Sequence, residues 1–309
     1  MELSGILSID KTAGYTSHRV VSLVRRVAGQ RSVGHTGTLD PGASGLLMLC
    51  LGNATLLSRF FTRLDKVYEG EILLGKRSTT YDREGEVTTV VENPRVTPEI
   101  IIETLNSLVG EQWQTPPKWS AIHVKGKRLY EYARRNDEVE IPRRKVTIHA
   151  IDLLAYTPPI VTFRARVSSG TYIRSLAHDV GERLGTGGLL NSLRRCSVGS
   201  FNVDNALFLE PDMLTRETIT KNMSGIYEAC NFLPRVVVDE KAFMRLRHGN
   251  PVVIKHAVPA ERQDDTPLNE TLVFRADRTF VAIALLNRDK EGYQILTPHR
   301  VVPMANKNP

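Results

Sequence analysis

The feature that most constrains this chain is the segment Gly34-His35-Thr36-Gly37-Thr38-Leu39-Asp40-Pro41, which leads into the apolar stretch 45–51. Glycines allow a sharply turning backbone, and Pro41 biases Asp40 towards an extended conformation. The pattern therefore predicts a tight loop that presents one carboxylate just before a buried strand. Such a carboxylate can act as a nucleophile or a general base. The same residues also fit an Asx-type turn that only starts the strand.

Chain length and charge narrow the possible partners. The 309 residues suffice for one large domain and one small one. A net charge of +7 favours a polyanionic partner. No apolar run is long enough to span a membrane, and the N-terminus lacks the basic start of a secretory signal. The three cysteines suit a reducing cytoplasm, and neither they nor the eight histidines show metal-ligand spacing, so we expect no metal and no membrane association.

Most of the excess positive charge lies in one segment. Residues 114–146 contain nine lysines and arginines but only four acidic residues. Trp119, Tyr130 and Tyr132 are interleaved with them. Aromatic rings and arginine planes can stack on bases, while cations hold phosphates. A solvated charged face is the simpler interpretation, but this mixture favours an RNA-binding arm laid over the body of the protein.

Hydrophobic periodicity predicts an α+β fold, with a mixed, largely antiparallel sheet and flanking helices. Strands are predicted at 6–9, 45–51, 67–74, 145–156 and 160–168, and helices at 17–28, 54–64 and 97–110. Residues 171–184 are predicted to form a helix or a strand-to-helix junction. Residues 192–196 are interpreted as a short basic segment. After a composition shift near residue 232, a helix at 241–248 and strands at 252–255, 272–275, 279–286, 293–296 and 300–302 indicate a small β-rich domain. The expected domains are 1–232, which includes the arm, and 233–309.

Three further places could join Asp40 around a reacting group. They are Tyr68 at the start of a predicted strand, Arg174 in the segment 169–174, and Leu193 in Leu193-Arg194-Arg195. Each is ambiguous alone. Tyr68 and Leu193 would ordinarily pack in a core, and Arg174 would ordinarily form a surface ion pair.

In their order and spacing these motifs resemble the TruB family of tRNA pseudouridine synthases, over roughly residues 5–200. The matching segments are Lys11 with 14–18, 34–41 with Gly45, 66–75, 80–85, 114–121, 126–130, 170–175 and 193–195. The C-terminal domain resembles the small RNA-binding PUA-like domain of that family more loosely.

The resemblance implies a pseudouridine synthase fold and an enzyme that converts uridine 55, in the T-arm loop of tRNA, to pseudouridine without a cofactor. It implies Asp40 as the nucleophile, Arg174 as its charge partner, and Tyr68 as the ring stacked under the extruded uracil. The other residues implied to bind substrate are His35, which would fill the space left by the base, Tyr172 and Leu193 as apolar walls, and Lys11, Lys66 and Asp82. The RNA backbone would be held by Arg128, Arg143 and Arg144 of the arm. A monomer without an obligate protein partner is expected.

The chain also departs from the family pattern. Thr12, Leu56, Trp119 and His123 stand where proline, a basic residue, tyrosine and lysine are usual. These departures concern contacts with RNA rather than the reaction. Two alternatives remain: an RNA-binding protein or tRNA-folding chaperone on the same scaffold, and a guide-RNA-dependent relative that modifies ribosomal RNA.

Overall fold

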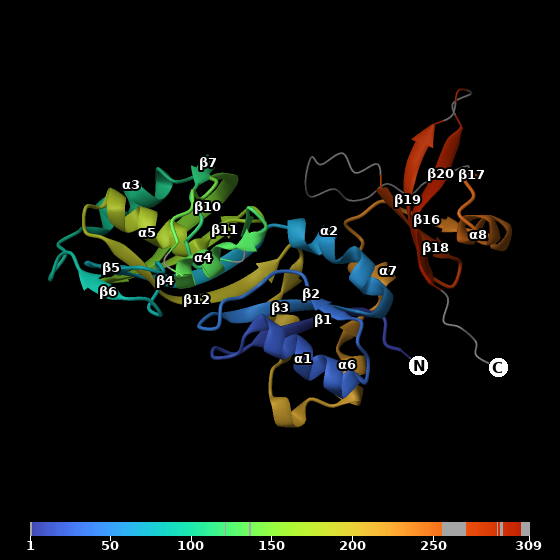
Figure 1. The fold of residues 1–309 in the computed structure, drawn as a ribbon, viewed down its shortest axis with the longest axis horizontal. Helices are drawn as coiled ribbons and strands as arrows, with labels where there is room; N and C mark the ends of the chain where they lie inside the picture. Colours follow the sequence, from blue (N-terminus) through green and yellow to red (C-terminus); the bar gives the residue numbers. More distant parts are fainter. Residues whose placement is uncertain are drawn as a thin grey trace.

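The structure is a computed structural model, and it describes residues 2–120, 122–135, 137–254, 270–288, 290 and 293–303 (Figure 1). Most of the chain surrounds one large sheet, and a smaller sheet near the C-terminus forms a separate unit beside it. None of the helices in the described residues is long and apolar enough to cross a membrane.

Within the described residues, eleven strands form the large sheet, in the order β14-β1-β3-β12-β4-β11-β10-β7, with β2, β13 and β15 paired off this path. The long strands are β1 (Gly5–Lys11), β3 (Ser44–Leu51), β4 (Lys66–Leu74), β7 (Gly110–Gln114), β10 (Arg144–Thr157), β11 (Ile160–Val167) and β12 (Gly188–Val198). The short ones are β2 (Val33–His35), β13 (Phe201–Asn202), β14 (Leu207–Phe208) and β15 (Met223–Ser224). Pairing is antiparallel except for β12 with β3 and β1 with β14. The predicted mixed, largely antiparallel sheet is therefore confirmed.

Helices pack around this sheet (Figure 1). They are α1 (Ser17–Ala28), α2 (Ser58–Arg63), α3 (Pro98–Asn106), α4 (Leu129–Arg135), α5 (Ile173–Arg183), α6 (Arg216–Lys221) and α7 (Ile226–Ala229), with 3-10 turns η1 (Gly52–Leu57), η2 (Val203–Asn205) and η3 (Pro211–Met213). The α1 and α6 helices lie together near β1, while α3 and α5 lie together at the far end (Figure 1). The start of α1 is fixed by Thr16, whose hydroxyl accepts a hydrogen bond from the Arg19 amide, and its end by Gly29, in the left-handed region.

Two small hairpins project from the body. One is formed by β5 (Lys76–Ser78) and β6 (Val87–Thr89). The other is formed by β8 (His123–Val124) and β9 (Lys127–Arg128), which leads into α4. This second hairpin and α4 lie within the predicted basic arm.

The C-terminal unit is a five-stranded sheet in the order β16-β18-β19-β20-β17, with the helix α8 (Glu240–Arg247). Its strands are β16 (Arg235–Val238), β17 (Val252–Ile254), β18 (Glu270–Arg275), β19 (Phe280–Arg288) and β20 (Gln294–Val301). This unit packs directly against the large unit. Leu272, Phe274 and Ile283 lie in the same buried hydrophobic cluster as Ile6 and Phe61 of the large unit. An ion pair between Arg59 and Glu270 also links the two units.

Several predicted elements need correction. The helix expected at 97–110 ends at Asn106, and Gly110 instead begins β7. The helix expected at 54–64 is a 3-10 turn followed by the short α2. Residues 192–196 belong to β12 in the middle of the sheet, where their polar side chains concealed a strand. The strands expected at 293–296 and 300–302 are one strand, β20. Lys255, the predicted end of β17, lies outside the described residues.

Candidate active site

The loop that carries Asp40 connects β2 to β3 and is fixed from both sides. The Ser17 hydroxyl, at the start of α1, donates to the Leu39 carbonyl at 3.0 Å and accepts from the Leu39 amide at 2.8 Å. The Gly14 amide donates to the Pro41 carbonyl at 2.8 Å. The Asp40 side chain keeps 44% of its surface exposed. A rigid backbone therefore presents an accessible carboxylate.

Lys11 supports this loop from below. Its ammonium is fully buried and donates to the carbonyls of Tyr15 and Ala43. The carbonyls of Thr12 and Pro41 are more distant acceptors of the same group. Burial lowers the pKa of Lys11 to about 8, an effect that the charge of Asp40 opposes and that of Arg195 reinforces. Lys11 does not line the pocket described below. The structure therefore places Lys11 beneath the Asp40 loop, in contact with its backbone.

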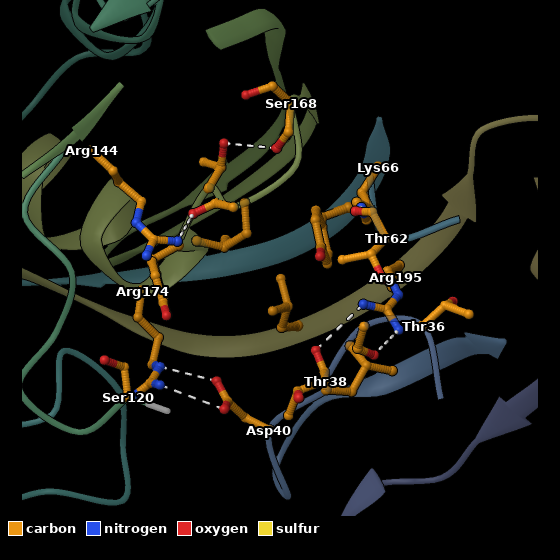
Figure 2. Close-up of a pocket in the computed structure, with 18 of the residues that line it drawn as sticks. Thr36, Thr38, Asp40, Thr62, Lys66, Ser120, Arg144, Ser168, Arg174 and Arg195 are labelled. Carbon is orange, nitrogen blue, oxygen red and sulfur yellow. Dashed lines mark hydrogen bonds and ion pairs between the residues drawn. The ribbon is translucent and has the colours of Figure 1, made fainter. Parts of the chain in front are cut away.

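Arg174 joins Asp40 to a second carboxylate. Its Nε lies 3.0 Å from Asp40 Oδ2, and its Nη1 lies 3.3 Å from Asp82 Oδ2. Its Nη1 and Nη2 also donate to the carbonyls of Thr80 and Trp119. With an 8% exposed side chain, Arg174 is held almost completely inside the protein. Figure 2 shows it reaching Asp40 across the pocket floor. Such a fixed, charge-assisted contact orients the carboxylate.

A pocket of about 440 Å³ opens above this ion pair, within the usual size range of ligand sites. Its walls combine aromatic and apolar side chains with hydroxyls and cations. The lining residues are Thr36, Gly37, Thr38, Leu39, Asp40, Thr62, Lys66, Tyr68, Trp119, Ser120, Tyr130, Arg144, Ser168, Gly170, Thr171, Tyr172, Ile173, Arg174, Leu193 and Arg195. Tyr68, Tyr172 and Leu193 are thus brought together with Asp40 and Arg174. A planar base fits between rings of this kind.

Arg195 lines the pocket, although the sequence motif that contains it predicts no role for it. Its side chain is 2% exposed. Its guanidinium donates to the carbonyls of Leu46 at 2.7 Å, Gly37 at 3.0 Å and Thr38 at 3.5 Å. Side chains alternate across a strand, so Leu193 and Arg195 share the pocket face of β12, while Arg194 faces away and binds Asp10. This alternation could have predicted Arg195 as a pocket residue, but only if residues 188–198 had been recognised as a strand.

The remaining candidates lie at the edge of the pocket or outside it. Asp82 lines a smaller adjoining cavity with Arg174 and Leu193. His35 lies on β2 outside the pocket lining, and burial, aided by the charges of Arg195 and His18, lowers its pKa. Among the arm arginines, Arg144 lines the pocket, whereas Arg128 and Arg143 do not.

The described residues offer no metal site. In that part of the chain, no group of three or more histidine, cysteine or acidic side chains could hold a metal ion. Arg143 donates to the Trp113 carbonyl, and the Arg128 guanidinium lies 5.9 Å from the Tyr130 ring centre.

Comparison with known families matches this chain twice. Residues 25–173 match the model for the N-terminal domain of TruB family pseudouridylate synthases, and residues 174–228 match the C-terminal domain of tRNA pseudouridylate synthase B. The chain belongs to the TruB family. It is 38% identical to tRNA pseudouridine synthase B of Clostridium acetobutylicum over 95% of this chain and 99% of that one. It is 41% identical to the protein of the same name from Dehalococcoides mccartyi, over 91% and 92%.

Solved structures agree at the level of the fold. An H/ACA ribonucleoprotein bound to a substrate RNA containing 2'-deoxyuridine matches with a TM-score of 0.70 and 22% identity, over 98% of this chain and 86% of that one. A Cbf5-Nop10-Gar1 complex matches with a TM-score of 0.70 and 24% identity, over 97% and 85%. The predicted pseudouridine synthase fold with a separate C-terminal β-domain is confirmed for this TruB-family enzyme.

Proposed function

We propose that this pseudouridine synthase acts on tRNA and converts the uridine at position 55 of the T-arm loop. The relatives named tRNA pseudouridine synthase B support tRNA as the substrate, and the motif resemblance implies the position. The observation that carries the proposal is the Asp40–Arg174 ion pair on the floor of an aromatic pocket, at 3.0 Å. Asp40, Tyr68 and Arg174 are the proposed catalytic residues.

The reaction is an isomerisation, so the site needs no external reactant. The bond from N1 of uracil to C1' of the ribose breaks, and a bond from C5 to C1' forms. C5 loses a proton, and N1 gains one. Asp40 supplies the carboxylate that starts this sequence, by attacking the ring, by attacking the sugar carbon, or by driving elimination. All three routes need this carboxylate oriented towards the target nucleoside, and the ion pair with Arg174 supports that orientation.

The aromatic residues hold the base while it turns. Tyr68 is buried on β4 and lines the pocket, so its ring can stack on an extruded uracil. Tyr172 and Leu193 close the walls. Extruding a paired or stacked base costs a few kcal/mol. We propose that His35 fills the vacated space in the RNA, and that its lowered pKa keeps it neutral and able to stack at pH 7.

The arm and the pocket rim would bind the surrounding RNA. Arg128, Arg143 and Arg144 are the proposed backbone contacts, and Lys66 and Asp82 belong to the proposed substrate site. Recognition would rest on the shape of the loop and on splayed bases. The proposed compartment is the cytoplasm, since the three cysteines are unpaired. A monomer without an obligate partner is proposed.

The test uses the purified chain and an unmodified tRNA transcript, with pseudouridine mapped along the product. Formation at position 55 alone is the expected result. Product at another position would contradict the proposed specificity. Formation only after addition of guide RNA and accessory proteins would instead support the guide-dependent alternative. Binding without any product would support the RNA-binding or chaperone alternative.

A further inference from the structure

The charges that line the pocket are unbalanced. Four cationic side chains, Lys66, Arg144, Arg174 and Arg195, line it together with one carboxylate, Asp40. Arg174 forms ion pairs with two carboxylates, those of Asp40 and Asp82. Figure 2 shows that the others are not spread evenly: Lys66 and Arg195 lie with Thr62 and Thr36 on the side of the pocket away from Arg174. We call this the Lys66–Arg195 corner.

Both cations of this corner are buried and bound only by backbone oxygens. Lys66 is 7% exposed, and its ammonium donates to the carbonyls of Thr62 and Leu64. Arg195 is bound by three carbonyls, as described above. In the described part of the chain, neither forms an ion pair with a carboxylate. The adjacent Asp65 is instead engaged by His149 at 3.1 Å and Arg166 at 3.7 Å.

The two cations also lie close enough to repel each other. Arg195 pairs with Tyr68 across the sheet, and Lys66 is two residues before Tyr68 on the same face of β4. Burial first, and then the charge of Arg195, lowers the pKa of Lys66 to about 8, although the charge of Asp65 opposes this shift. Burying two positive charges close together is unfavourable unless an anion binds between them.

The corner has donors to spare for such an anion. A lysine ammonium has three N–H groups, of which two are used, and a guanidinium has five, of which three are used. Uracil is neutral, so it cannot supply the missing charge. The RNA backbone on either side of the uracil carries one negative charge per phosphate.

We propose that Lys66 and Arg195 bind a backbone phosphate flanking the target uridine. This subsite rests on the proposed RNA substrate. It would anchor the sugar-phosphate at one side of the pocket while Asp40 and Arg174 meet the reacting nucleoside at the other. The glycosidic bond would thereby be held between two fixed points, which favours the reactive geometry.

The test uses T-arm stem-loops in which one phosphate flanking the target uridine is replaced by an uncharged methylphosphonate. With the wild-type enzyme, one of the two replacements is expected to lower kcat/KM by about tenfold or more, the size typical of a lost charge-assisted hydrogen bond. Lys66→Met should be slower on unmodified RNA yet lose less than about twofold on the same replacement, because its cation is already gone. Lys66→Arg keeps the charge and should keep the sensitivity.

The matched control is Lys221→Met, at the exposed end of α6, which should respond as the wild type does. Equal losses in wild type and Lys66→Met would overturn the proposal, as would a wild-type enzyme indifferent to both replacements. The wild-type comparison holds even if Lys66→Met fails to fold. Failure of the proposed function looks different: the wild type would then make no pseudouridine from unmodified stem-loop, and the same comparisons would be made on RNA-binding affinity.

Discussion

Gly45 on β3 faces the backbone of Arg195 on β12 so closely that a Cβ at Gly45 would collide with the Arg195 carbonyl group. Gly45 also has a φ of +99°. This contact brings the strand that follows the Asp40 loop against the strand that carries Leu193 and Arg195. The absence of a side chain at Gly45 therefore allows the close pairing of β3 with β12.

Gly45→Ala is expected to lower the free energy of unfolding by about 3 kcal/mol, from backbone strain and overpacking together. Chemical denaturation measures it. Gly110→Ala is the matched control, because Gly110 has a φ of +110° with open space around its Cβ position. Gly110→Ala should lower the free energy of unfolding only by the cost of backbone strain. Equal losses at the two positions would mean that the Arg195 contact does not matter.

Asp40→Asn is expected to reduce pseudouridine formation by at least about 10³-fold, because an amide cannot act as the nucleophile. RNA affinity should change less than about threefold, since the amide keeps the shape of the side chain. Turnover and fluorescence anisotropy measure the two effects. Asp152→Asn, the same change on the exposed face of β10, should leave both unchanged. Retained turnover in Asp40→Asn would remove Asp40 from the chemistry.

Reversal of Arg143 and Arg144 to Glu is expected to weaken tRNA binding and to flatten its dependence on salt. Each lost phosphate contact should reduce the slope of log K against log salt by about 0.9. Arg95→Glu, in an exposed loop away from the pocket lining, provides the control. An unchanged slope in the double variant would show that this part of the arm does not touch RNA.

Asp179 on α5 is expected to make stability depend on pH. Burial raises its pKa to about 6, although Arg183 opposes this shift. Between its ordinary pKa and 6 the folded state binds more protons than the unfolded state, so this contribution to stability is present in acid and is lost as pH rises through 6. Urea unfolding of wild type and Asp179→Asn from pH 4 to 7 should show the wild type losing stability relative to the variant. A constant difference would contradict the expectation.

Phe274 in the C-terminal sheet is fully buried in the cluster shared by the two units, with its ring 4.9 Å from that of Tyr227. Phe274→Ala is expected to cost about 3–5 kcal/mol and to shift one transition for the whole chain. Val237→Ala, at an exposed position on β16, should change little. Calorimetry with two separate transitions, only one of them shifted, would show that the units unfold independently.

The sequence predicted the parts of the site that depend on local patterns. The glycine-rich loop around Asp40 and the helical stripe of α1 are of this kind, and both predicted elements are present in the structure. Tyr68 and Arg174 were singled out by motif, and the structure brings both to the Asp40 pocket.

What could not be predicted depends on contacts distant in the chain. β12 pairs with β4 and β3, more than one hundred residues earlier. The alternation of Leu193, Arg194 and Arg195 could be assigned to the two faces of a strand only once this pairing was known. Burial of Arg195 could not be predicted either, because the carbonyls of Gly37 and Leu46 that accept its hydrogen bonds lie about 150 residues earlier in the chain. The contacts of Lys11 were hidden for the same reason, since it donates to backbone oxygens of a loop about 30 residues away.

The shared hydrophobic cluster between the two units has a consequence for how RNA is selected. A domain on a flexible linker can meet its ligand at many distances, whereas one fused through a common core meets it at a single distance. Any RNA that reaches both the Asp40 pocket and the C-terminal sheet must match that separation. The fixed core thus makes the separation between the pocket and the C-terminal sheet a property of the fold and not of a linker.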